Sequence, residues 1–115
     1  MGLNQKHCVP CEGGVAPLKK VEIDSLIKEL KPGWKVVDNK LEKEYKFDDF
    51  LQALSFTNLV GKVAENENHH PDIELGWGRV KLILWTHAVN GLTENDFILA
   101  AKADDELSHQ SPACF

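Results

Sequence analysis

The chain has 115 residues, of which 43 % are apolar and 27 % charged, as in an ordinary globular protein. This length fits one domain with its own core. The formal net charge of −5 argues against a nucleic-acid-binding protein, which normally carries a basic patch. No apolar run reaches the roughly 20 residues that cross a bilayer, and the first residues lack the apolar stretch of a secretory signal. We therefore expect a cytoplasmic protein that binds neither nucleic acid nor a membrane.

Both ends of the chain are predicted to be tails. Residues 1–17 are expected to form a flexible N-terminal tail, because prolines and glycines interrupt any regular element there. Residues 108–115 form a short predicted C-terminal tail, so the predicted domain spans 18–107. The tails carry the three cysteines Cys8, Cys11 and Cys114. This odd number argues against a disulfide framework, and a single Cys8-x-x-Cys11 pair is weak support for a zinc or redox site.

The first half of the chain predicts a helix followed by a hairpin. Apolar residues recur at helical spacing over 23–30, and Pro32-Gly33 ends this helix. Strands are expected over 34–37 and 41–47, and Asp38-Asn39 between them is a turn signal. The alternation of the second strand leaves one of its faces polar enough to contact water.

A longer helix of about 18 residues follows, with Asp48 or Asp49 as its N-cap. Pro71 disfavours helical geometry at His70, so we expect the helix to end there and the pair His69-His70 to lie at a helix-to-strand junction. The apolar stripe of this helix is predicted to consist of Phe50, Leu54, Thr57, Gly61 and Ala64, widened by Leu51, Val60 and Val63.

The second half predicts another strand pair and a last helix. Residues 73–77 and 80–86 alternate in opposite phase, which places a tight turn or bulge at Gly78-Arg79. Thr93 is the expected N-cap of the last helix, with Asp96 completing a capping box.

The resulting order, α-β-β-α-β-β-α, predicts an α+β fold. Hairpins pair antiparallel, and amphipathic helices need a sheet face to cover. We therefore expect a four-stranded antiparallel sheet with the helices packed on one face. The other face would be exposed, lined in part by Lys43, Tyr45 and Phe47, or covered by a partner subunit.

The histidines are the best candidates for chemistry. His69 and His70 are adjacent, so their side chains diverge, which makes them poor partners for one metal ion and leaves two solvated surface histidines as the plain interpretation. His87 argues against this plain interpretation. In an antiparallel sheet, the end of the strand that leads to His87 lies beside the start of the strand after Pro71, so His87 is expected near the histidine pair. Three imidazoles in one pocket suit acid–base chemistry near neutral pH. Glu65, one helical turn before His69, is expected to face the same way.

The spacing of these residues resembles the signature of the pterin-4a-carbinolamine dehydratases. The pattern is Glu65, three residues, His69-His70-Pro71, five residues, Trp77, nine residues, His87, eight residues and Asp96. The order of elements also resembles the family fold from about residue 18 to residue 107. The resemblance implies a hydro-lyase that removes water from a 4a-hydroxytetrahydropterin and so recycles the pterin cofactor of aromatic amino-acid hydroxylases.

The resemblance also implies roles for individual residues. His69 and His87 would transfer protons, and His70 would bind substrate or support the transfer. Glu65 would orient a histidine or hold the pyrimidine edge of the pterin. The other predicted substrate-binding residues are Trp77, Thr86 and Asp96, although a strand tryptophan is more often core and Asp96 is equally a helix cap.

No metal and no other cofactor is implied, since the substrate is itself a pterin. The family resemblance further implies a homodimer or homotetramer, with an aromatic amino-acid hydroxylase as a possible partner. Two alternatives stay open from the sequence: a non-catalytic dimerisation or coactivator-type module, and a metal-binding protein that uses the three histidines.

Overall fold

The computed structural model describes residues 2–8 and 16–109. Its helices and strands are α1 (Lys20–Ile27), β1 (Lys35–Val37), β2 (Lys40–Lys46), α2 (Phe50–Glu67), β3 (Asp72–Gly76), β4 (Arg79–Leu84) and α3 (Glu94–His109), with short 3-10 helices η1 (Leu3–Gln5) and η2 (His87–Val89). The predicted order of the main elements is confirmed. In the described part of the chain, no helix combines the length and the apolar character needed to cross a membrane.

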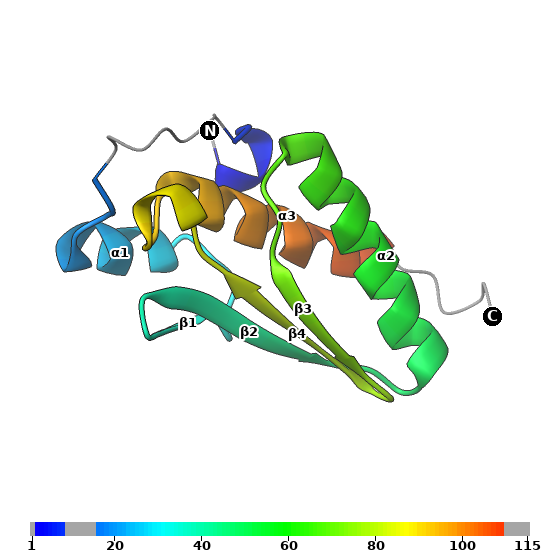
Figure 1. Cartoon of the computed structure of the whole chain (residues 1–115). Coiled ribbons are helices and arrows are strands. Elements are labelled where there is room, and N and C mark those ends of the chain that lie inside the picture. The colour runs from blue at the N-terminus through cyan, green and yellow to red at the C-terminus, as the bar shows by residue number, and fades with distance from the viewer. Residues whose placement is uncertain (1, 9–15, 110–115) are drawn as a thin grey trace.

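The four strands form one antiparallel sheet in the order β1-β2-β4-β3. Figure 1 shows the three α-helices on one side of this sheet, so the predicted α+β fold is confirmed. The turn between β1 and β2 is made by Asp38 and Asn39, both with positive φ, at 51° and 62°. Two successive left-handed residues match the right-handed twist of a hairpin, and Asp and Asn tolerate this conformation better than most residues.

Helix α2 packs on the sheet with a face that matches the predicted stripe only in part, since Val60 and Ala64 are buried as expected. Ala53 and Phe56 are fully buried, whereas Phe50 is 43 % exposed and Leu51 is 54 % exposed. Asp49 caps the helix as expected, accepting a hydrogen bond from the backbone N–H of Gln52 at 2.8 Å. The prediction was wrong for the first turns of the helix, because apolar residues occur there on two sides and spacing alone admits either face.

Two polar side chains of β2, Lys43 and Tyr45, face the side that the helices cover. Tyr45 is 4 % exposed and packs against Phe56, so the prediction that Lys43, Tyr45 and Phe47 line the open face is wrong. The buried carboxylate of Asp104 on α3 explains this arrangement. It accepts hydrogen bonds from the Tyr45 hydroxyl and the Lys43 ammonium, both at 2.7 Å. A buried carboxylate needs hydrogen-bond donors, and a buried hydroxyl or ammonium group likewise needs an acceptor.

Asp104 accepts one further hydrogen bond, from Nε1 of Trp34 at 2.8 Å. Its two oxygens thus hold donors from β2 and from the residue that precedes β1. Helix α3 is thereby tied to the hairpin through one carboxylate.

The start of the chain is folded, contrary to the prediction of a tail. Residues 2–8, here called the N-terminal segment, contain η1, and Leu3 is 4 % exposed within the main core. Asn4 and Lys6 bond side chains of α3, Asp105 at 2.6 Å and Glu94 at 2.9 Å. Residues 9–15 and 110–115, which include Cys11 and Cys114, lie outside the described residues. Helix α3 continues to His109, two residues past the predicted domain boundary.

The sheet topology brings distant parts of the sequence to one end of the molecule. Asp72, at the start of β3, pairs with Ile83 near the end of β4. The residues before β3 and those after β4 are therefore neighbours. Figure 1 shows the end of α2 and η2 near each other, above the same end of the sheet.

Candidate active site

One wall of the site is built where α2 ends. Asn68 adopts the left-handed conformation with φ 51°, and its N–H bonds the carbonyls of Ala64 and Glu65. The N–H of His69 also returns to the Ala64 carbonyl, at 3.2 Å. Asparagine is one of the few residues besides glycine that adopts this conformation readily, so it ends the helix. The helix therefore ends before Pro71 is reached, which corrects the prediction that Pro71 terminates it.

The opposite wall follows β4. Thr86 accepts and donates backbone hydrogen bonds with Gly91, which closes a loop around η2. His87 begins η2, and its ring stacks on Trp85 with centroids 4.2 Å apart and an interplanar angle of 17°. The ammonium of Lys40 lies 4.3 Å from the Trp85 ring centroid. The stack gives His87 a defined ring orientation although the residue is exposed.

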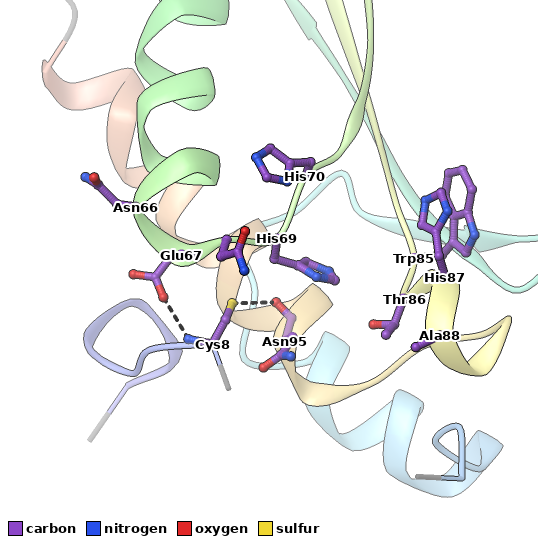
Figure 2. A pocket seen from close by; sticks show the side chains of 11 residues that line it. Cys8, Asn66, Glu67, His69, His70, Trp85, Thr86, His87, Ala88 and Asn95 are labelled. Atoms are coloured by element: carbon purple, nitrogen blue, oxygen red, sulfur yellow. Dashed lines mark hydrogen bonds between the residues drawn. The ribbon is translucent and has the colours of Figure 1, made fainter. Parts of the chain in front are cut away.

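Between these walls lies a pocket of about 650 Å³, within the usual size range of small-molecule sites. Figure 2 shows its lining side chains, with His69 between the helix end and the Trp85–His87 pair. The lining residues are Cys8, Asn66, Glu67, Asn68, His69, His70, Trp85, Thr86, His87, Ala88 and Asn95.

A completely buried carboxylate holds His69. Nε2 of His69 lies 2.6 Å from Oδ1 of Asp96, which is 0 % exposed. The other oxygen of Asp96 accepts the Thr86 hydroxyl at 2.9 Å and the backbone N–H of Thr93 at 3.0 Å. The bond to Thr93 is the predicted capping interaction, which is confirmed. Asp96 therefore connects the start of α3, the end of β4 and one histidine.

His70 has a more exposed partner. Its Nε2 lies 2.6 Å from Oε1 of Glu65, with side chains 53 % and 77 % exposed. Glu65 was expected to face His69, and this is wrong, because the backbone leaves helical geometry at Asn68 and the four-residue helical relation no longer applies. Glu65 thus supports His70 from beside the pocket.

The structure brings together most of the predicted site residues. His69, His70, His87 and Thr86 line one pocket, with Asp96 and Glu65 bonded to two of them. Trp77 lies apart, beyond the opposite end of β3, and at 71 % exposed it is not a core residue either. The five residues of β3 lie between it and the histidine pair, so Trp77 is at the other end of the strand from the pocket.

Sequence reasoning missed several lining residues. Trp85 precedes the predicted Thr86 and could have been found from that position, since it flanks a candidate histidine. Asn95 and Glu67 carried no spacing signal. Cys8 was placed in a tail, and only the packing of η1 brings it to the pocket.

The histidines do not form an evident metal site. Within residues 2–8 and 16–109, no group of three or more His, Cys, Asp or Glu side chains is arranged to hold one metal ion. Two of the three histidines are instead each bonded to a carboxylate that orients the ring. Such pairs fix which ring nitrogen faces the pocket.

Comparison with known proteins agrees with the sequence pattern. The sequence model of the family described as pterin 4 alpha carbinolamine dehydratase matches residues 16–106. A protein of Rickettsia canadensis with that provisional name is 51 % identical over 106 residues, covering 91 % of this chain and 97 % of the relative. A similarly named protein of Rubrobacter xylanophilus is 52 % identical over 103 residues, covering 89 % and 95 %.

Solved structures show the same fold. The crystal structure of a transcriptional coactivator/pterin dehydratase from Brucella melitensis is similar with a TM-score of 0.73 and 33 % identity, over 77 % of this chain and 96 % of that one. A pterin dehydratase-like protein described as a RuBisCO assembly factor in the alpha-carboxysome shares the fold at a TM-score of 0.53 and 23 % identity, over 68 % and 89 %. The family match over nearly the whole described domain, together with relatives at about half identity, establishes that this chain belongs to the pterin 4 alpha carbinolamine dehydratase family.

Proposed function

We propose that the pocket binds a 4a-hydroxytetrahydropterin and removes water from it, giving the quinonoid dihydropterin. The observation that carries this proposal is the convergence of three histidines on one pocket, two of them bonded to carboxylates, in a chain of this family. The pocket volume of about 650 Å³ is ample for a bicyclic pterin with a short substituent.

The reaction needs two proton transfers. The hydroxyl on C4a is a poor leaving group unless it is protonated, and it then departs as water while the N5 lone pair forms the N5–C4a double bond. The proton on N5 is lost, so the protons balance. A positioned acid and a positioned base each contribute roughly 10²- to 10⁴-fold to such a step. His69 and His87, on opposite walls, are the proposed proton-transferring pair.

The hydrogen bond to Asp96 defines which atom of His69 reacts. An ionised carboxylate only accepts hydrogen bonds, so Nε2 of His69 donates to it and Nδ1 is left to exchange a proton. His70 is held in the same manner by Glu65 and is assigned to substrate binding and support of the transfer. Thr86 contributes by fixing Asp96 rather than by touching the reacting atoms.

The proposed reaction requires no metal, flavin or nucleotide. The physiological role that follows is the recycling of the pterin of an aromatic amino-acid hydroxylase, as a 4a-hydroxytetrahydrobiopterin dehydratase. The substrate arises by hydroxylation at C4a, so an oxygenase that uses a reduced pterin must supply it.

A direct assay tests the proposal. The purified, chelator-treated protein should accelerate the loss of 4a-carbinolamine generated by an aromatic amino-acid hydroxylase, followed by pterin absorbance. His69→Ala and His87→Ala should each lower kcat at least tenfold, because each removes a proton-transfer group. The Tm should change little for His87→Ala and should fall for His69→Ala, which leaves Oδ1 of the buried Asp96 without its donor. Lys62→Ala, on the exposed face of α2, is the control that should retain the wild-type rate.

Three outcomes would each contradict a part of the proposal. A folded protein that does not accelerate the loss of the carbinolamine is not a dehydratase. Wild-type rates in both histidine variants would instead refute the proton-transfer roles while leaving the activity intact. Activity lost on chelation and restored by zinc would contradict the metal-free mechanism.

A further inference from the structure

The N-terminal segment is attached to the pocket end of the molecule at several points. Leu3 inserts into the core, and Asn4 and Lys6 bond α3 as described. These contacts position Cys8, the last described residue of the segment, at the pocket. The segment precedes residues 16–106, which match the family model, so the pocket has a wall that this match does not account for.

A buried carboxylate secures the end of the segment. The Glu67 side chain is only 6 % exposed, and its Oε1 accepts the backbone N–H of Cys8 at 2.7 Å. Its Oε2 lies 2.9 Å from Lys102 Nζ and 2.9 Å from Nδ1 of His7. Burial alone would raise the pKa of Glu67, but the bonds from Lys102, Cys8 N–H and His7 outweigh it and lower the pKa to about 2. The carboxylate is therefore ionised at neutral pH and binds the segment.

Cys8 lies at the end of the pocket that is remote from His87. Its thiol donates a 3.5 Å hydrogen bond to the carbonyl of Asn95, which also lines the pocket. Figure 2 shows Cys8, Asn95 and Glu67 together on one side and the Trp85–His87 stack on the other, with His69 between them. Because Cys8, His69 and His87 line one pocket, a flat ligand that extends from the His87 wall past His69 comes next to Cys8.

We propose that the N-terminal segment is a wall of the substrate pocket, that Cys8 contacts the bound pterin at the end remote from His87, and that Glu67 is a positioning residue that holds this wall in place. This inference rests on the proposed function, because it assigns the ligand as a pterin. A thiol is small and polarisable and packs well against an aromatic ring. Contact away from the reacting atoms contributes uniform binding, which changes KM and leaves kcat unaltered.

Steady-state kinetics give the first test. Cys8→Ala should raise KM about threefold to tenfold with kcat within twofold, because the contact is lost and the proton-transfer groups are untouched. Glu67→Gln keeps the size of the side chain but removes its charge, and it should raise KM in the same direction. Glu106→Gln makes the same change on α3, at a side chain next to the segment, and is the matched control that should leave KM unchanged.

Chemical modification gives the second test, with a readout that a merely structural role would not move. In a Cys11→Ser, Cys114→Ser protein, Cys8 is the only thiol, and its alkylation by iodoacetamide can be followed by mass spectrometry. Saturating 7,8-dihydrobiopterin should slow this alkylation at least fivefold, and adenosine at the same concentration should not. Glu67→Gln in the same protein should speed the alkylation measured without ligand, because the segment is held less firmly.

Turnover and pterin binding of the wild-type protein are measured first, which separates the two proposals. This inference alone would be overturned if the wild-type protein is active, the Cys8→Ala variant has the wild-type KM, and bound pterin does not change the rate of Cys8 alkylation. A wild-type protein that neither binds nor dehydrates a pterin would overturn the proposed function, and this inference with it.

Discussion

Asp96 shows how one residue can serve both the fold and the site. Its Oδ2 accepts the N–H of Thr93 at the start of α3 and the hydroxyl of Thr86, and its Oδ1 faces His69. A fully buried carboxylate is costly unless each oxygen is satisfied, and here three donors satisfy it. The helix cap and the orientation of the histidine are therefore one hydrogen-bond network.

Replacing Asp96 with asparagine should lower both the stability of the fold and the activity of the site. The amide has one acceptor oxygen for three donors, so at least one buried donor loses its partner, which costs about 1–3 kcal/mol of stability. His69 also loses the carboxylate that fixes its tautomer, so kcat should fall at least tenfold. Denaturant unfolding and the dehydratase assay measure the two effects.

Asp104→Asn is the matched control, since Asp104 is another buried carboxylate of α3 but lies away from the pocket. It should destabilise the protein and leave the kcat of the folded fraction unchanged. An Asp96→Asn variant that retained full kcat would mean that the His69 contact has no catalytic value.

The sequence could identify some site residues and not others, because each residue depends on a different kind of signal. His69, His70 and His87 could be grouped because strand order places both segments at one sheet end. The partner of Glu65 could not be predicted, because it depends on where the helix breaks at Asn68. Cys8 could not be placed either, since its position depends on long-range packing of the N-terminal segment.

At the scale of elements, the C-terminal cap of α2 decides where the histidine pair points. Asn68 adopts the left-handed conformation, so the chain turns away from the helix axis at the next residue. A residue with a Cβ and no local hydrogen-bonding side chain pays roughly 1–2 kcal/mol for this conformation. The cap is therefore a local determinant of the site geometry.

Asn68→Ala should lower the free energy of unfolding by about 1 kcal/mol, whereas Asn68→Gly should stay within about 0.5 kcal/mol of the wild type, because glycine adopts positive φ without strain. Urea denaturation of the two variants measures the difference. Asn58→Ala, at an exposed position inside α2, is the control and should be neutral or slightly stabilising. Equal stability of the alanine and glycine variants at position 68 would contradict a strained cap.

The elements themselves were largely predictable, because their ends carry strong local signals. Asp38-Asn39, Asp49 and Thr93 each mark a boundary that the structure reproduces within a residue or two. The buried face of α2 was predictable only in part: Val60 and Ala64 were identified, but Phe50 and Leu51 extend the apolar surface beyond the stripe that packs on the sheet.

At the scale of the whole molecule, Asp104 links α3 to the hairpin through Trp34, Lys43 and Tyr45. Burial, followed by the charge and the hydrogen bond of Asp104, raises the pKa of Tyr45 far above its usual value. The native protein therefore keeps a proton that the unfolded chain releases above about pH 10, so stability should fall as the pH rises beyond that point.

This titration can be observed directly, because Tyr45 is the only tyrosine in the chain. The near-ultraviolet phenolate signal should appear together with the loss of helical circular dichroism, and not before it. Asp104→Asn removes the negative charge beside the Tyr45 hydroxyl, so the Tyr45 phenolate of this variant should appear at lower pH than in the wild type. Phenolate formation near pH 10 with the helices intact would show that Tyr45 is not held as described.

The assembly of the molecule stays a prediction of the family resemblance. Exposed apolar side chains occur on several parts of the surface, for example Val36 on β1, Leu51 on α2 and Trp77 at the β3–β4 turn. Single exposed apolar residues are normal, but a homodimer or homotetramer would have such groups to cover.

The double use of Asp96 also limits how this protein can evolve. A descendant that lost the proposed activity could replace His70 or His87 without changing any hydrogen bond of Asp96, whereas loss of His69 would remove one of its three donors. It could not replace Asp96 so freely, since the N–H of Thr93 and the hydroxyl of Thr86 would still need a buried acceptor. In lineages that keep the fold but abandon the chemistry, this aspartate should therefore persist longer than the histidine it once supported.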